Sequence, residues 1–389
     1  MKENPLLKLE RFGQSVWLDF IRRGMITSGE LAELIREDGL RGITSNPSIF
    51  EKAVGGSHDY DQTIRALALE GKNAHQIYES LTVEDIQRAA DLFIHVYDEV
   101  GGTNGFVSLE VSPYLAHDTA GTVAEARRFW AAVQRPNLLI KVPATQEGLP
   151  AIQQLISEGI NVNVTLLFGL ERYREVAEAY IAGLEARAAQ DGPLKLVASV
   201  ASFFVSRIDL LVDSLLEQLI HRAGAKSEME AALRGKVAVA SAKVAYQMYQ
   251  ELFFSNRFRS LALRGAHPQR LLWASTSTKN PSYSDVKYVE ALIGPGTINT
   301  VSLQTLNAYR DHGHPASRLE KGMTEARQVL DRLAEIGINL EEVAQQLEDD
   351  GIEKFVLAFD RLMDTLEKKR AETFREPVDR QTLHNRQSF

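Results

Sequence analysis

Short apolar runs that end in polar residues alternate along the chain with longer stretches of helical period. Several runs are apolar at consecutive positions, as is typical of strands buried on both faces of a sheet. The eight runs are 14–19, 41–44, 106–110, 138–142, 160–165, 195–200, 270–274 and 297–301. Such alternation predicts an α/β fold with a parallel sheet wrapped by helices, and eight parallel strands predict a closed (β/α)8 TIM barrel.

The intervening stretches predict helices over 28–38, 82–96, 122–133, 170–189, 208–221 and 236–254. Thr82 and Asp85 have the spacing of a capping box, which would begin the second helix. Two connections, 51–105 and 208–269, are longer than a minimal barrel needs. We therefore expect extra helices around the barrel rim.

The chain becomes strand-poor and helical after about residue 315. One helical segment is expected to begin near 339, and 352–369 is expected to form an amphipathic last helix. We predict that residues 1–315 form the catalytic barrel. Residues 316–389 are expected to form C-terminal helices that pack on the barrel as part of the same domain.

Composition narrows the classes of function. The 389 residues carry 44 Lys and Arg against 52 Asp and Glu, a net charge of −8, which argues against nucleic-acid or anionic-membrane partners. There is no cysteine, so disulfides, cysteine zinc sites and thiol nucleophiles are excluded. The sequence shows no secretory apolar segment and no apolar run near the roughly 20 residues of a membrane span, so we expect a cytoplasmic location.

Polar residues stand at the ends of the predicted strands. The active site of a (β/α)8 barrel lies at the carboxyl ends of its strands, so these residues are candidates for function. They are Asp19, Thr44, Asn46, Glu110, Lys141, Asn163 and Thr165. We expect Asp19, Glu110 and Lys141 to converge at one barrel mouth.

Lys141 is the most informative of these residues, because it lies among Leu138, Leu139, Ile140 and Val142. Burial among apolar neighbours favours the neutral amine. A neutral amine can attack a ketone to form a Schiff base, which eases cleavage of the adjacent carbon–carbon bond. The alternative is a structural lysine paired with a carboxylate.

Nearby carboxylates meet a need of that chemistry, since Schiff-base formation and retro-aldol cleavage both require proton transfer. Asp19 and Glu110 come from different strands at the same end of the barrel. The alternative for each is a structural ion pair with Lys141.

A phosphate site is indicated where VASFFVSRID follows the sixth predicted strand and begins a helix, with Ser202, Ser206 and Arg207. Backbone amides, the helix dipole and a guanidinium would face one anion there. Lys279, after the seventh strand, would complete the site. The alternatives are an ion pair of Arg207 with Asp209 or Asp213, and a solvated Lys279.

Other signals are weak or missing. The sequence has no Walker A motif, no G-x-G-x-x-G after a strand, no G-x-S-x-G and no H-E-x-x-H. His312 and His314 form an H-x-H, but no carboxylate or third histidine accompanies them at a strand end, so we interpret them as loop residues and predict no metal site.

Five segments are similar to those of a known family. GITSNPSIF and NLLIKVPATQEGLPAI resemble the two signature segments of transaldolases, and INVNVTLLF, SFFVSRID and TINTVSLQTL resemble further family segments in the same order. The similarity extends from about residue 14 to about residue 310. The greater length of the chain resembles a long-chain subgroup.

The resemblance implies class I aldol chemistry in the pentose phosphate pathway, with no metal and no cofactor. A dihydroxyacetone unit would pass from sedoheptulose 7-phosphate to glyceraldehyde 3-phosphate, giving erythrose 4-phosphate and fructose 6-phosphate. Phosphorylated sugars are thus the expected partners. The sequence leaves the oligomeric state open, with a homo-oligomer as one option.

The resemblance also implies residue roles. Lys141 would form the Schiff base, Asp19 would deprotonate the sugar hydroxyl, and Glu110 and Thr165 would hold a catalytic water. The sugar site would include Thr44, Asn46, Asn163, Ser202 and Phe204, with the phosphate on Arg207. Lys279 stands where many members carry a second phosphate-binding arginine, and a lysine is a point charge rather than a bidentate group.

Three other functions remain open at this level. A fructose 6-phosphate aldolase on the same scaffold would release the dihydroxyacetone instead of transferring it. A metal-dependent aldolase would need a histidine-rich site at the strand ends. A non-catalytic sugar-phosphate sensor would need no desolvated amine.

Overall fold

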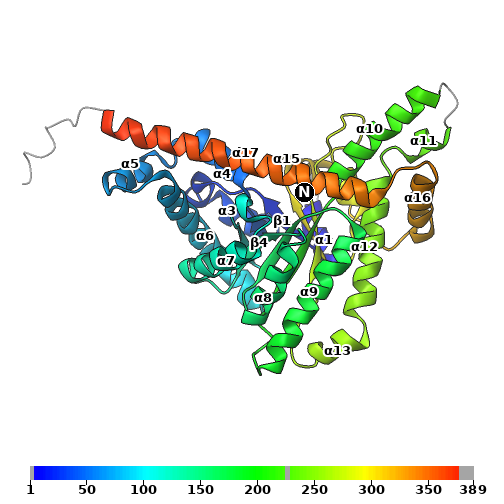
Figure 1. The fold of residues 1–389 in the computed structure, drawn as a ribbon, viewed down its shortest axis with the longest axis horizontal. Coiled ribbons are helices and arrows are strands. Elements are labelled where there is room, and N and C mark those ends of the chain that lie inside the picture. The colour runs from blue at the N-terminus through cyan, green and yellow to red at the C-terminus, as the bar shows by residue number, and fades with distance from the viewer. Residues whose placement is uncertain (1–3, 224–227, 376–389) are drawn as a thin grey trace, which may run out of the picture.

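Eight parallel strands form a closed barrel in the computed structural model, which describes residues 4–223 and 228–375 (Figure 1). Each strand pairs with the next in the chain, and the last pairs with the first, which closes the barrel. The strands are β1 (Gln14–Asp19), β2 (Leu40–Thr44), β3 (Phe106–Glu110), β4 (Leu138–Pro143), β5 (Val162–Leu167), β6 (Ser199–Phe204), β7 (Arg270–Ala274) and β8 (Thr297–Val301). The predicted (β/α)8 architecture is confirmed.

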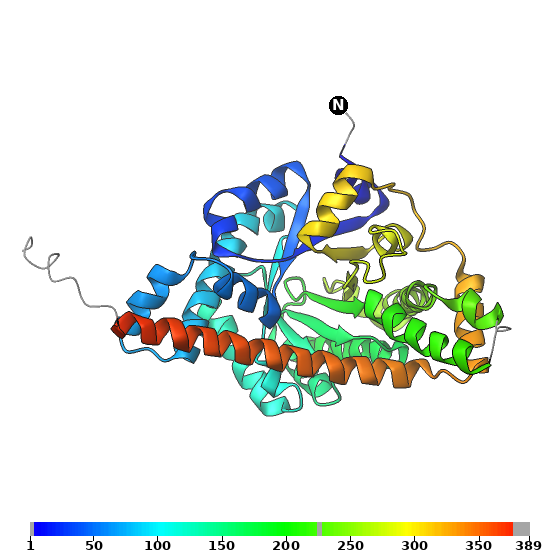
Figure 2. The ribbon, with the colours of Figure 1, turned by 90° about the horizontal axis from the view of Figure 1, so that it is seen from above.

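Helices surround the barrel on its outside and around its rim (Figures 1 and 2). They are α1 (Pro5–Leu9), α2 (Arg23–Thr27), α3 (Glu30–Glu37), α4 (Pro47–Gly55), α5 (Asp61–Leu69), α6 (Ala74–Glu99), α7 (Thr119–Val133), α8 (Gly148–Glu158), α9 (Leu170–Ala189), α10 (Ser206–Ala223), α11 (Glu228–Leu233), α12 (Val237–Phe253), α13 (Asn256–Ala262), α14 (Lys287–Ala291), α15 (Leu303–His312), α16 (Met323–Glu335) and α17 (Leu340–Arg375). Short 3-10 helices lie at Glu10–Phe12 and Pro113–Leu115. The long connections before β3 and β7 carry the expected extra helices α4 to α6 and α11 to α13.

Two strands lie further along the chain than predicted. The sixth was expected at 195–200 and is Ser199–Phe204, and the fifth was expected at 160–165 and is Val162–Leu167. Apolar residues continue through both regions, so the pattern did not mark the first residue of either strand. As a result, Ser202 belongs to β6 itself rather than to the loop after it.

The predicted start of a helix at Thr82 was wrong. Helix α6 begins at Ala74, where Asn73 and Gln76 form the capping box. Thr82 lies inside the helix, and its hydroxyl donates to the carbonyl oxygen of Tyr78 at 2.9 Å. Asp85 is buried and binds Arg23 on α2, so its role is a tertiary contact rather than a cap.

The C-terminal region differs from its prediction in one respect. A single helix, α17, replaces the two separate segments that were expected. Figure 2 shows α17 (orange to red) running across one face of the barrel. It packs against α4, α5, α6 and β5, so the end of the chain covers part of the barrel mouth.

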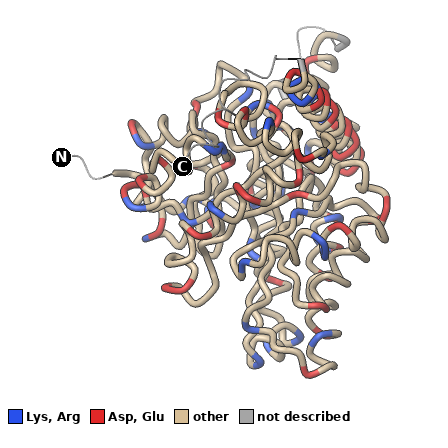
Figure 3. The backbone as a smooth tube through the Cα atoms, turned by 90° about the vertical axis from the view of Figure 1, so that its left-hand side faces the viewer, with Lys and Arg blue, Asp and Glu red and all other residues tan. Residues whose placement is uncertain are grey.

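Charged residues of both signs are interspersed along the backbone (Figure 3). No helix within the described ranges is long and apolar enough to cross a membrane.

Candidate active site

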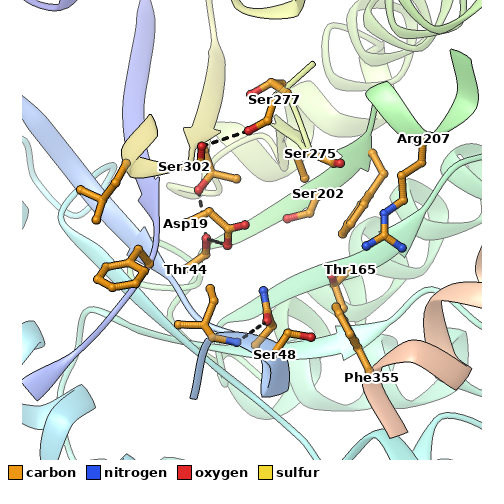
Figure 4. Close-up of a pocket in the computed structure, with 18 of the residues that line it drawn as sticks. Asp19, Thr44, Ser48, Thr165, Ser202, Arg207, Ser275, Ser277, Ser302 and Phe355 are labelled. Carbon is orange, nitrogen blue, oxygen red and sulfur yellow. Dashed lines mark hydrogen bonds between the residues drawn. The ribbon is translucent and has the colours of Figure 1, made fainter. Parts of the chain in front are cut away.

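A cavity of about 460 Å³ lies at the carboxyl ends of the strands. Figure 4 shows Asp19 and Thr44 on one side of this cavity and Arg207 and Phe355 on the other. The predicted site residues that line it are Asp19, Thr44, Asn46, Lys141, Thr165, Ser202, Phe204, Arg207 and Lys279. Glu110 and Asn163 lie behind this lining, hydrogen-bonded to Lys141 and Ser202. The fold therefore brings the predicted residues together.

Lys141 is held by two buried acceptors. Its ammonium nitrogen Nζ lies 2.9 Å from Oε2 of Glu110 and 2.9 Å from the carbonyl oxygen of Ser45. The β3–β4 register places Glu110 directly beside Lys141, and the two side chains are each 5% exposed. The short contact between the amine nitrogen and the carboxylate oxygen suits the pair to exchanging a proton.

Burial also acts on the carboxylate of this pair. It raises the pKa of Glu110 above its ordinary value, although the Lys141 ammonium acts in the opposite direction. A carboxyl group with a raised pKa more readily accepts and returns a proton near neutral pH.

Asp19 approaches the cavity from the other side. The β1–β2 register places it beside Thr44, whose hydroxyl donates to Oδ1 of Asp19 at 2.7 Å. The Thr44 hydroxyl also lies 2.9 Å from the hydroxyl of Thr300 on β8. Asp19 is half-buried, so its free oxygen can reach a ligand in the cavity.

A row of polar side chains crosses the barrel interior below the cavity. Asn163 donates from Nδ2 to the hydroxyl of Ser108 at 3.0 Å and accepts from the hydroxyl of Ser202 at 2.6 Å. Both ends of the Asn163 amide are thereby satisfied, which fixes its orientation. In contrast, the buried hydroxyl of Thr165 has no partner among the described residues, so it is free to bind water or substrate.

Two cations lie at the far end of the cavity. Arg207 is in the first turn of α10, and its buried Nη1 has no hydrogen-bond partner within the described chain. Burial lowers the pKa of Arg207, while Asp19 opposes that shift. Lys279 is exposed at the mouth, where desolvation and the neighbouring Arg207 lower its pKa. Two cations at one end of a cavity are suited to bind one phosphate group.

The alternative partners of Arg207 are engaged elsewhere. Asp209 accepts from the hydroxyl of Tyr288 and pairs with Lys287. Asp213 accepts from the hydroxyl of Tyr283 at 2.7 Å. The structure therefore does not support a structural ion pair of Arg207 with either aspartate.

The cavity also includes residues that the sequence did not single out. Lys52 and Ser48 come from α4, whose N-terminus is capped by the Asn46 side chain. Ser275 has a left-handed backbone with a φ of 54°, which is unusual for a residue other than glycine and is found at functional sites. Phe355 comes from α17, and no local signal marked it.

No group of three or more acidic or histidine side chains suited to a metal ion occurs in the part of the chain that the structure describes. His312 is exposed and contacts Asp285 and Asp311. It lies on α15, and it does not line the cavity.

The barrel and its cavity define a (β/α)8-barrel enzyme, and comparison with known proteins gives the family. Residues 16–366 match the family described as Transaldolase/Fructose-6-phosphate aldolase. A transaldolase of Trichodesmium erythraeum is 49% identical over 95% of this chain and 98% of its own length. One from Saccharopolyspora erythraea is 48% identical over 91% of this chain and 94% of its own. The chain belongs to the transaldolase/fructose-6-phosphate aldolase family.

Proposed function

We propose that this protein is a transaldolase that acts through a Schiff base on Lys141. It transfers a dihydroxyacetone unit from sedoheptulose 7-phosphate to glyceraldehyde 3-phosphate, giving erythrose 4-phosphate and fructose 6-phosphate. The mechanism is supported by one observation: the buried amine of Lys141 lines the cavity and is hydrogen-bonded to Glu110, and Asp19 lies on the other side of the cavity. Its family and its relatives named transaldolase support the activity.

The first half of the reaction forms the covalent adduct. Glu110 takes a proton from Lys141, and the neutral amine adds to the ketone carbon of the donor. Loss of water then gives the iminium ion, with a water held between Glu110 and Thr165 carrying the proton. The hydroxyl of Thr165, which has no hydrogen-bond partner within the ranges that the structure describes, is available for that water.

Cleavage and transfer follow from the same geometry. Asp19 removes the proton of the hydroxyl next to the scissile bond, and the iminium ion takes up the electron pair as the carbon–carbon bond breaks. The aldehyde product leaves, and the acceptor aldehyde enters its place. The new bond forms as Asp19 returns the proton, and water then releases the product ketose from Lys141.

Binding of the substrate would use the remaining predicted residues. Arg207 and Lys279 hold the phosphate, since both are cations at the same end of the cavity. The sugar hydroxyls lie along Thr44, Asn46 and Ser202, with Phe204 beside them, and Asn163 supports the site from behind through Ser202. This places the ketone near Lys141 and the phosphate at the far end.

Trapping of the adduct tests the mechanism. The protein is incubated with fructose 6-phosphate and borohydride, and its peptides are mapped by mass spectrometry, with Lys141→Ala as the control. We expect a reduced dihydroxyacetone unit on Lys141 that is absent from the variant. Folded protein that binds the sugar phosphate but forms no adduct would instead indicate a non-catalytic sensor.

Product analysis separates transfer from simple aldol cleavage. Erythrose 4-phosphate is offered as the acceptor with fructose 6-phosphate as the donor. A transaldolase forms sedoheptulose 7-phosphate, whereas a fructose 6-phosphate aldolase releases dihydroxyacetone at the same rate with and without the acceptor.

We expect the protein to act in the cytoplasm. A cytoplasmic location fits the substrates, and fractionation of the source cells checks it. The assembly state is measured by light scattering, which distinguishes a monomer from a homo-oligomer.

A further inference from the structure

One apolar side chain of α17 reaches the cavity. Phe355 is 5% exposed, and it is the α17 residue that lines the cavity within the described chain. Figure 4 shows its ring extending from α17 toward Thr165. The C-terminal helix therefore contributes to the same space as Lys141.

Contacts on both sides hold this part of α17 in place. One turn later, the Phe359 ring packs edge-on against Tyr78, with centroids 5.3 Å apart, and against Tyr114 at 6.2 Å. One turn earlier, a Cβ atom at Gly351 would lie only 2.8 Å from the side chain of Leu166, so the helix contacts the end of β5 directly. Residues four apart share one helix face, so Phe355 is fixed between these two contacts.

Phe355 shares the cavity with aromatic residues and with proposed catalytic residues. Phe204 lines the same cavity, and its ring packs against Phe168 with centroids 5.1 Å apart. Thr165 and Lys141 line the cavity too. Two aromatic rings thus form part of the wall of the cavity that Lys141 also lines.

Water competes with the acceptor in the proposed reaction. After the first aldehyde leaves, the three-carbon unit on Lys141 carries an extra electron pair on carbon. If that carbon takes the proton that Asp19 removed during cleavage, the iminium ion forms again, water adds to its carbon, the carbon–nitrogen bond breaks, and dihydroxyacetone leaves with the amine restored. Hydrolysis of the iminium ion also ends the transfer branch, so the two branches differ at protonation of the carbon, and exclusion of water from that carbon favours transfer.

We propose that Phe355 restricts water at the Lys141 adduct and thereby favours transfer to an aldehyde over release of dihydroxyacetone. This inference rests on the proposed Schiff-base function. Phe355 acts by occupying space. Its side chain has no acidic or basic group that could transfer a proton, so it affects the fate of the adduct more than the formation of the adduct.

The test measures the ratio of released dihydroxyacetone to sedoheptulose 7-phosphate, with fructose 6-phosphate and erythrose 4-phosphate as substrates. Phe355→Ala is expected to raise this ratio about tenfold, equivalent to about 1.4 kcal/mol between the two competing steps. Phe355→Leu retains part of the volume and is expected to raise it about threefold. Leu357→Ala is the matched control, since Leu357 lies on the same helix but is 48% exposed, and it should leave the ratio unchanged.

A ratio that stays at the wild-type value in Phe355→Ala, even if both rates fall together, would overturn the inference, because a purely structural role lowers both rates alike. If Phe355→Ala does not fold, Phe355→Leu decides in the same way. Borohydride trapping distinguishes failure of the proposed Schiff-base function from failure of the proposed role of Phe355. Absence of the adduct in the wild type overturns the proposed function, whereas an adduct with an unchanged ratio overturns only the role of Phe355.

Discussion

Replacement of Asp85 by asparagine is expected to destabilise the protein by about 2–4 kcal/mol, because it breaks a buried ion pair and leaves Arg23 with only the partly exposed Glu84 as a carboxylate partner. Asp85 is 0% exposed and accepts from Nε of Arg23 at 2.8 Å and from the hydroxyl of Tyr60 at 2.9 Å. The substitution leaves the buried guanidinium beside a neutral amide. A helix cap at this position, as the spacing with Thr82 suggested, would contribute only about 1 kcal/mol.

Glu84→Gln provides the matched control. Glu84 binds the same Arg23 through Nη2 at 2.7 Å, but its side chain is 36% exposed, so its loss is expected to cost about 1 kcal/mol or less. Urea unfolding measures the change in the free energy of unfolding of each variant, and amide hydrogen exchange shows which segments lose stability. We expect faster exchange in α5 and the first turns of α6. An equal decrease in the free energy of unfolding of the two variants, or a decrease below about 1 kcal/mol for Asp85→Asn, would show that burial does not make the Asp85 ion pair stronger than that of Glu84.

Three further predictions concern the phosphate end and the barrel floor. Asp350→Asn is expected to tighten inorganic phosphate binding about twofold at low salt, because the negative charge of Asp350 interacts with Arg207. Asp349→Asn is expected to have a smaller effect. Isothermal titration calorimetry at two salt concentrations checks both variants. Lys279→Arg is expected to lower KM for fructose 6-phosphate with kcat unchanged, since a guanidinium binds phosphate through two donors, and a raised KM would count against Lys279 as a phosphate ligand. Arg270→Met is expected to lower the free energy of unfolding by about 3 kcal/mol, because Arg270 donates to five oxygens at the opposite end of the barrel, but to leave kcat of the folded enzyme unchanged.

The sequence predicted strands best where a polar residue or a turn ended the apolar run. β1 and β3 match their predicted bounds because Asp19 and Glu110 close them. β6 was displaced, because apolar residues extend on both sides of its true start and the alternation gives no boundary. Local pattern indicates that a strand exists, whereas pairing with its neighbours fixes its register.

The candidate site was predictable for a similar reason. In a parallel barrel the carboxyl ends of all strands meet at one face, so polar residues at strand ends must lie near one another. Asp19, Glu110 and Lys141 stand at such strand ends, and the structure brings Glu110 and Lys141 into contact beside the cavity that Asp19 lines. Their individual catalytic roles stay predictions, as does the domain division at residue 315.

The sequence by itself determined the barrel, the order of its strands and the residues at their ends, because these depend on periodicity and on short segments of chain. Only the tertiary structure decided which partners those residues take. The pairing of Lys141 with Glu110 and the approach of Phe355 to the cavity both join residues distant in sequence. Such contacts follow from how the helices and strands pack. The periodicity of apolar residues within one segment does not show which other segment packs against it.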